Sequence, residues 1–171
     1  TSRLNEELQQ LLNPGNNGQT ASRFGVVFKK DDRVMQIKNN YTKFVFNGDI
    51  GSVVKIDQPD QKLQVQFGDR TVEYEFYELN ELVLAYAISI HKSQGSEFKA
   101  VIIPLMMQHF VMLQKNLIYT AVTRAKQVCV IVGDPRALGM AVGSNKEQKR
   151  MTLLRDFIRG EVVVEDLPTL F

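Results

Sequence analysis

The chain has 171 residues, of which 44% are hydrophobic and 23% charged, which suits one ordinary globular domain carrying a small insertion. Its longest apolar stretch, about eight residues, is far short of the roughly 20 that a membrane span needs, so we expect no membrane association. The single cysteine, Cys129, excludes an internal disulfide and predicts a reducing compartment, the cytoplasm. Two histidines and one cysteine, scattered along the chain, do not make an ordinary zinc site, so no metal ligands are predicted.

The formal net charge of +2 is unevenly distributed along the chain. Residues 29–43, 91–126 and 144–160 are rich in lysine and arginine, whereas residues 57–81 carry two bases and seven acids. A polyanion would therefore meet the three basic segments and avoid the acidic one. Ordinary solvated faces explain the same charges and are the more common case.

The first residues predict a helix. Ser2 is a suitable N-cap, and leucines repeat at helical spacing at positions 4, 8, 11 and 12. Asn13, Pro14 and Gly15 end the pattern. The chain starts at Thr1 and enters this helix at once, which indicates a cut within a larger protein or N-terminal processing.

A series of short strands follows. Two runs alternate apolar and polar residues around a turn at Gly68-Asp69, and such alternation buries one face and leaves the other in water. The strands are predicted at residues 33–38, 50–56, 63–67 and 72–76. Together they predict a small antiparallel barrel of about five strands over residues 46–82.

The pattern changes after residue 82. Near-continuous apolar runs, typical of buried parallel strands, occur at 84–90, 100–105 and 127–132. Helices are predicted at 113–125, 136–142 and 146–159, followed by a tail at 161–171. The fold class is therefore predicted as α/β, a parallel sheet with helices that is interrupted by the small antiparallel barrel.

A polar loop, residues 91–97, follows the first of these apolar strands at its carboxyl end, where open α/β sheets bind ligands. Gly95 lets backbone N–H groups approach an anion, and the serine hydroxyls can contact phosphate. The carboxylate of Glu97 can accept hydrogen bonds from a sugar hydroxyl. A polar connection with a glycine turn explains the same residues equally well.

Arg124 stands at the end of the predicted helix 113–125, apart from its apolar stripe. A guanidinium there could reach a triphosphate and stabilise the charge that develops on the γ-phosphate. Composition alone favours a simpler explanation, a surface arginine that pairs with the helix C-terminus.

Three aromatic residues, Tyr41, Phe44 and Phe46, lie in a basic stretch and could stack on nucleobases. Aromatic residues are more often part of a core, and that is the favoured interpretation here. The acidic hairpin at 63–76 is interpreted as a structural brace or a protein-contact surface, because it would repel phosphates.

Two blocks of this sequence resemble motifs V and VI of superfamily 1 DNA helicases, and the RecD family most closely. They are HKSQGSE at 91–97 and YTAVTRAK at 119–126. Two further blocks agree with that family in order: residues 4–14 resemble the helix before an inserted barrel, and residues 32–51 resemble the entry into it. One departure is Asp31-Asp32, where the family pattern leads us to expect a glycine-containing turn.

The resemblance implies a fold. The chain would be the C-terminal RecA-like domain of a P-loop helicase, its second motor domain, with an inserted Src-homology-3-like barrel. The implied boundaries are 1–45 and 83–160 for the RecA-like domain, 46–82 for the barrel and 161–171 for the tail.

The resemblance also implies an activity for the parent protein, which would use ATP with Mg²⁺ to move 5′ to 3′ on single-stranded DNA. The expected partners are that DNA strand, the N-terminal RecA-like domain of the same parent chain, and other subunits of a helicase–nuclease complex. The implied nucleotide-binding residues are Gly95, Glu97 and Arg124, of which Arg124 is the arginine finger. The resemblance implies that His91, Lys92 and Ser93 contact the DNA backbone or couple the two sites. It implies weaker candidates for DNA contact at Asn39, Asn40 and Tyr41.

Part of the catalytic machinery is missing from the sequence. It contains no G-x-x-x-x-G-K-[ST] phosphate loop and no Asp-Glu dipeptide, so it lacks the phosphate-binding lysine and the acidic pair that holds Mg²⁺. We therefore predict that this chain alone binds no cofactor tightly, hydrolyses no ATP and unwinds no DNA. The alternatives from other classes are an ATP-independent nucleic-acid-binding module, a protein-interaction module, or part of an RNA helicase.

Overall fold

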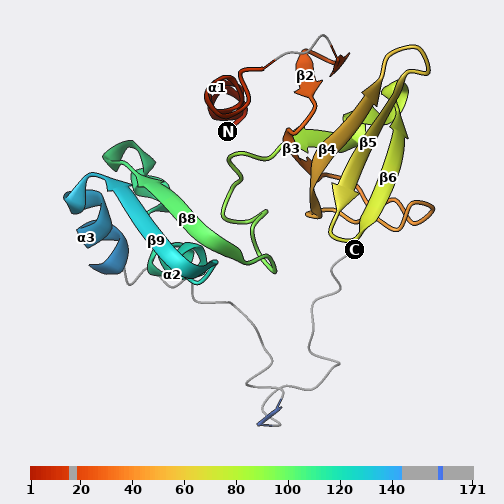
Figure 1. The fold of residues 1–171 in the computed structure, drawn as a ribbon. Coiled ribbons are helices and arrows are strands. Elements are labelled where there is room, and N and C mark those ends of the chain that lie inside the picture. The colour runs from red at the N-terminus through yellow and green to blue at the C-terminus, as the bar shows by residue number, and fades with distance from the viewer. Residues whose placement is uncertain (16–18, 144–157, 160–171) are drawn as a thin grey trace, which may run out of the picture. The chain divides into compact units, whose positions relative to one another are not determined.

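The computed structural model describes residues 1–15, 19–143 and 158–159. These residues belong to two compact units, one of residues 1–103 with 119–131 and the other of residues 104–118 with those from 132 onward. In chain order (Figure 1) the elements are α1 (Ser2–Leu12), β1 (Thr20–Arg23), β2 (Val26–Lys29), β3 (Arg33–Gln36), β4 (Ile50–Asp57), β5 (Lys62–Phe67), β6 (Arg70–Glu75), η1 (Phe76–Glu81), β7 (Leu82–Leu84), β8 (Phe98–Leu105), η2 (Met107–Met112), α2 (Lys115–Val122), β9 (Ala125–Gly133) and α3 (Pro135–Gly143).

The first unit contains an antiparallel sheet of five strands in the order β6-β5-β4-β3-β7 (Figure 1). The predicted strands of this region are confirmed as β3, β4, β5 and β6. The predicted alternation is also present in β5, in which every second side chain is buried, namely Leu63, Val65 and Phe67. A Cβ on Gly51 of β4 would lie 2.6 Å from the carbonyl oxygen of Gln66, so only glycine allows this close approach to β5.

The sheet extends beyond the region in which the barrel was expected. Strand β3 lies outside residues 46–82, and it pairs with β7, which begins at Leu82 and ends beyond them. A hairpin of β1 and β2, which the sequence patterns do not predict, adds Ala21 and Phe28 to the same core. Its two-residue turn, Phe24-Gly25, has positive φ angles of 47° and 80°, as hairpin turns of this length require.

Helix α1 buries its polar face, not its leucines. The helix is confirmed at Ser2–Leu12, although its N-cap is Thr1, but Leu11 and Leu12 are 76% and 68% exposed. The buried residues are Asn5 and Gln9, one turn apart. Amide side chains are buried on this face because the adjoining chain presents backbone groups and a carboxylate, which amides can satisfy and leucines cannot.

The predicted parallel strand at 84–90 is wrong. Strand β7 ends at Leu84 and is antiparallel to β3, and residues 85–97 contain no strand. Ala85 is buried and donates its backbone N–H to the carbonyl of Arg33 at 2.8 Å, while the Asn5 side chain forms two hydrogen bonds of 2.8 Å with the backbone of Ala87. Only Leu84 and Ala85 of the apolar run are buried, and the rest of the segment is half-buried or exposed and held by side-chain contacts to the backbone instead of a strand ladder.

The strands β8 and β9 run parallel, as predicted. Phe98 donates its backbone N–H to the carbonyl of Arg124, where both strands begin, and Asp134 donates to Leu105, where both end. Their predicted burial is wrong for β9, most of whose side chains are exposed, Cys129 included, whereas β8 buries Ile103 and Leu105. Of the predicted parallel sheet, the described part of the chain contains the two strands β8 and β9.

The second unit has a small core of its own, formed by Leu105, Leu113, Ile118, Ala137 and Ala141. The predicted helices at 113–125 and 136–142 correspond to α2, which is shorter, and to α3. The predicted helix at 146–159 lies outside the described residues except for its last two positions, and the tail lies outside them entirely. No helix in the described ranges is both long and apolar enough to cross a membrane.

Candidate functional site

The loop at 91–97 is a series of tight turns. Ser93 is buried, and its hydroxyl donates to the carbonyl of Ile90 at 2.7 Å. His91 and Lys92 are exposed, so of the three predicted DNA-side residues here only these two face solvent. Gly95 has a φ of +83°, in the left-handed region that favours glycine, and it turns the chain back toward β8.

Arg124 contacts this loop. Its guanidinium donates to the carbonyl of Ser96 at 3.1 Å, to the carbonyl of Thr120 at 3.1 Å and to the hydroxyl of Thr123 at 3.3 Å. The half-buried side chain thus holds the end of α2 against the loop, although Arg124 and Ser96 are 28 residues apart in sequence. The two motif segments that the sequence singled out are therefore brought together in the first unit.

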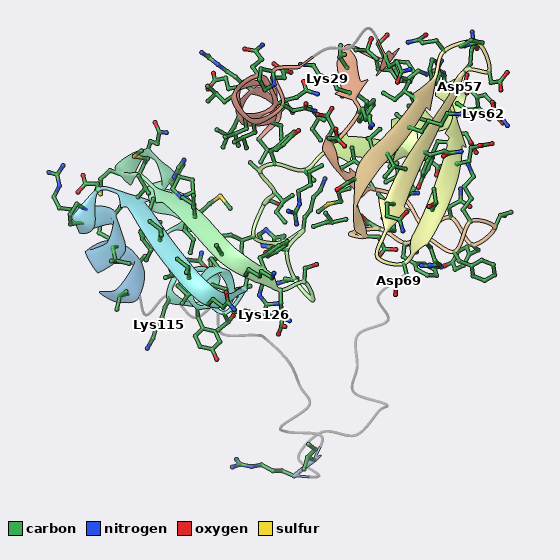
Figure 2. The ribbon with its side chains drawn as sticks, viewed as in Figure 1. Lys29, Asp57, Lys62, Asp69, Lys115 and Lys126 are labelled. Carbon is green, nitrogen blue, oxygen red and sulfur yellow. The ribbon has the colours of Figure 1, made fainter. Side chains whose placement is uncertain are left out.

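Glu97 and Lys126 form an ion pair beside Arg124. The Lys126 ammonium lies 2.8 Å from the Glu97 carboxylate, and Figure 2 labels Lys126 at the start of β9. The hydrogen bond from Lys126 and its charge, with a smaller contribution from Arg124, lower the pKa of Glu97. The pair is more than half exposed and adds little stability, but it keeps an ionised acceptor between two cations.

The loop that joins β3 to β4 holds the other predicted site residues. Asn39 accepts a hydrogen bond from the backbone N–H of Asn47 at 2.9 Å, and Asn40 accepts one from Lys43 at 3.1 Å. Both asparagines therefore brace the loop with their side-chain oxygens. Tyr41 is 72% exposed.

Asp32 is a buried carboxylate that the sequence analysis treated only as part of a turn. It is 0% exposed and accepts four hydrogen bonds, from the Gln9 amide at 2.5 Å, the Asn13 amide at 2.8 Å, the backbone N–H of Lys29 at 2.7 Å and the Tyr86 hydroxyl at 2.8 Å. We call these five residues the Asp32 junction. It joins α1, the turn between β2 and β3, and the segment that leads to the polar loop.

A signal for the Asp32 junction was present in the sequence. Asn5, Gln9 and Asn13 recur every four residues and so share one face of α1 and its C-cap. The preceding residue, Asp31, has a φ of 69°, so the turn uses the left-handed conformation for which a glycine was expected. Burial and the hydrogen bond to Asp32 raise the pKa of Tyr86 to about 12.

The described residues contain no group of three or more histidine, cysteine or acidic side chains arranged to hold a metal ion. Glu97 is the carboxylate of the candidate site, and cations flank it. The described site therefore offers groups for an anion and for hydroxyls, and no cluster of carboxylates for Mg²⁺.

Two family models match the chain. Residues 4–67 match the SH3 domain of ATP-dependent RecD-like DNA helicases, and residues 84–132 match the UvrD-like helicase C-terminal domain. The region of the barrel and the region with the β8–β9 pair and the loop that Arg124 contacts are therefore each similar to a domain of DNA helicases. More particularly, the chain is homologous to the C-terminal region of RecD-family DNA helicases.

Relatives and solved structures agree. The chain is 37% identical over 151 residues to the ATP-dependent RecD2 DNA helicase of Deinococcus radiodurans, covering 88% of this chain and 21% of that protein. It is 32% identical over 134 residues to the RecBCD enzyme subunit RecD of Haemophilus influenzae, covering 78% of this chain and 18% of that protein. The chain thus spans about a fifth of the length of these relatives.

Two Pif1 helicase structures share the fold. The structure from Bacteroides in complex with ADP-AlF3 and single-stranded DNA has a TM-score of 0.57 at 22% identity, covering 85% of this chain and 37% of that chain. The structure from Candida albicans has a TM-score of 0.50 at 19% identity, covering 92% and 41%. Both support a helicase-like fold.

Proposed function

We propose that the chain is the C-terminal motor-domain part of an ATP-dependent helicase that moves 5′ to 3′ on single-stranded DNA. The observation that carries the proposal is the hydrogen bond between the Arg124 guanidinium and the Ser96 carbonyl, because it joins the two segments that resemble motifs V and VI. The name of the Deinococcus relative, an ATP-dependent DNA helicase, supports the same activity. The barrel is proposed to be an insertion in the RecA-like motor domain, with the strands β1, β2 and β3 belonging to the barrel.

Arg124 is proposed as the arginine finger. A guanidinium has five N–H donors, and three of those in Arg124 donate to acceptors among the described residues. The other two are available to a γ-phosphate, while the bonds to Ser96 and Thr120 hold the side chain in place. A fixed cation of this kind stabilises the charge that develops in phosphoryl transfer.

The nucleotide would be contacted from the same loop. The ionised carboxylate of Glu97 suits the hydroxyls of a ribose, and the turn at Gly95 presents backbone near the phosphates. Since the sequence has no phosphate loop and the described residues have no cluster of metal ligands, the Mg²⁺ of the nucleotide would be held by the N-terminal RecA-like domain of the parent. The chain alone is expected to show no Mg²⁺-dependent ATP turnover, and robust turnover would contradict this assignment.

The DNA strand is proposed to pass the exposed His91 and Lys92, with Asn39, Asn40 and Tyr41 as further contacts from the barrel. Ser93 is buried and its hydroxyl donates to the carbonyl of Ile90, so its proposed role is to couple the DNA and nucleotide sites. The name of the Haemophilus relative, a subunit of the RecBCD enzyme, supports the further proposal that the parent works with other subunits of a helicase–nuclease complex.

The test is DNA-stimulated ATP hydrolysis by the complete parent protein with Arg124→Ala. Loss of an arginine finger lowers turnover by roughly 10³- to 10⁵-fold, and a fall of that order is expected here with DNA binding retained. Arg136→Ala is the matched control, because Arg136 is an exposed arginine whose hydrogen bonds within the described residues are all to Asp134. Unchanged turnover in Arg124→Ala would demote Arg124 to a structural residue and favour an ATP-independent nucleic-acid-binding module.

A further inference from the structure

The loop between β3 and β4, residues 37–49, exposes three aromatic side chains, and we call it the aromatic loop. Tyr41 is 72% exposed, Phe44 64% and Phe46 42%, so the favoured interpretation that they belong to the core is wrong. The loop is drawn in orange in Figure 1, between the labels β3 and β4 along the chain. Large apolar rings gathered on one short exposed segment mark a binding surface more often than an ordinary loop.

The backbone of the aromatic loop is firmly held. Asn40 and Val45 exchange two backbone hydrogen bonds of 2.8 and 3.1 Å, and the buried side chain of Val45 joins the barrel core. The backbone N–H of Phe46 donates to the Asp49 carboxylate at 2.8 Å, and the Asn40 amide donates to Glu81 at 3.2 Å. The rings are therefore presented from a fixed frame, so binding would cost little conformational entropy.

Phe44 has a φ of 54°, a left-handed conformation that is rare for a bulky residue. Such a conformation persists only where the surroundings hold it, and it occurs preferentially at binding sites. Tyr41 and Phe46 contact each other edge to face, with ring centroids 5.9 Å apart and planes at 73°. This arrangement sets the rings at different angles instead of burying them against each other.

The charges around the aromatic loop suit bases better than a track of phosphates. The aromatic loop contains two bases, Lys38 and Lys43, and one acid, Asp49, and Lys43 is paired with Glu78 at 2.5 Å. Lys38 is exposed. A surface with three exposed aromatic rings and little net charge binds flat apolar groups most favourably, and single-stranded nucleic acids present such groups as unstacked bases.

We propose that the aromatic loop is a base-stacking platform on which Tyr41 and Phe44 contact nucleobases of the single-stranded DNA. The proposal rests on the proposed function, because it specifies how the barrel would contact the strand that the motor domain moves along. In this proposal the barrel contacts the bases, whereas His91 and Lys92 contact the phosphate backbone.

The test uses the complete parent protein and two labelled strands of equal length, one with bases and one with a run of abasic sites, in a fluorescence anisotropy titration. Tyr41→Ala is expected to weaken binding of the strand with bases by roughly 5- to 150-fold, the range for loss of one stacked base, and to leave binding of the abasic strand unchanged. Tyr41→Phe keeps the ring and is expected to bind like the unaltered protein, which also controls for folding.

Tyr77→Ala is the matched control, because Tyr77 is 66% exposed on η1 of the same unit and lies outside the aromatic loop. The proposal is overturned if Tyr41→Ala weakens both strands equally, if it weakens neither, or if Tyr77→Ala has the same effect. Those outcomes leave the proposed function intact provided that the parent still hydrolyses ATP in response to DNA. Loss of the proposed function would instead appear as a parent protein that binds neither strand.

Discussion

The five-stranded antiparallel sheet and the parallel β8–β9 pair bury their side chains very differently. In β5 the apolar residues Leu63 and Val65 are 0% exposed, whereas in β9 Val130 and Val132 are 43% and 49% exposed. In the antiparallel sheet, neighbouring strands are joined by short connections, since β4, β5 and β6 follow one another along the chain. The β8–β9 pair would need cover on both faces, as parallel sheets normally have.

The difference teaches that two kinds of apolar pattern carry different information. An alternating pattern, as in β5, indicates which face of a strand is buried, and in this sheet strands nearby in sequence provide the neighbours. A continuous apolar run, as in β9, indicates that both faces of the strand need to be covered, but it does not indicate which part of the protein covers them. The comparison predicts where substitutions will be most harmful.

The largest expected effect separates the two regions directly. Leu63→Ala should lower the free energy of unfolding by about 2–5 kcal/mol, because it leaves a cavity in a fully buried core. Val130→Ala should lower it by less than about 1 kcal/mol, because its side chain is already half exposed. Urea unfolding followed by circular dichroism measures both, and equal losses would show that β9 is as well covered as β5.

A smaller effect is expected at the Asp32 junction, which holds the antiparallel region to α1. Asp32→Asn should lower the free energy of unfolding by about 1–3 kcal/mol, because the new NH₂ group would face two donors whichever way the amide is turned. The neighbouring Asp31→Asn is the control, since Asp31 is exposed and asparagine also tolerates its positive φ. If both variants melt at the temperature of the unaltered chain, the junction contributes nothing.

The smallest expected effect is a change in pH dependence. Tyr86→Phe removes one donor of the junction and should cost about 1 kcal/mol. Because the pKa of Tyr86 is raised from 10.0 to about 12, the folded protein keeps a proton that the unfolded chain loses, and the resulting stability is complete below pH 10 and lost as the pH rises through 12.

The melting temperature of Tyr86→Phe should therefore fall less steeply between pH 10 and pH 12 than that of the unaltered chain. Tyr74, whose pKa burial also raises, is present in both proteins and cancels in the comparison. Parallel melting curves across this interval would show that Tyr86 does not titrate differently in the two states.

The sequence predicts the hairpin of β5 and β6 well, because alternation and a Gly-Asp turn are local signals. It also predicts that the 91–97 loop and Arg124 belong to one site, though only through resemblance, since no periodicity joins Ser96 to Arg124. The junction at Asp32 was not foreseen, because helix prediction weighs leucines and gives no weight to amides such as Gln9. The exposure of Tyr41 depends on backbone hydrogen bonds of its loop, which composition does not reveal.

The Asp32 junction also has a consequence for where the chain can be divided. Two of the four donors to this carboxylate, Gln9 and Asn13, come from α1 and its C-cap, and a third, Tyr86, lies beyond the barrel. A barrel expressed as residues 33–84 would lack the carboxylate itself, and one beginning after residue 13 would hold a buried charge with half its partners. The smallest autonomous unit around this barrel therefore begins at α1 and ends after Tyr86, whatever boundary the strand pattern suggests.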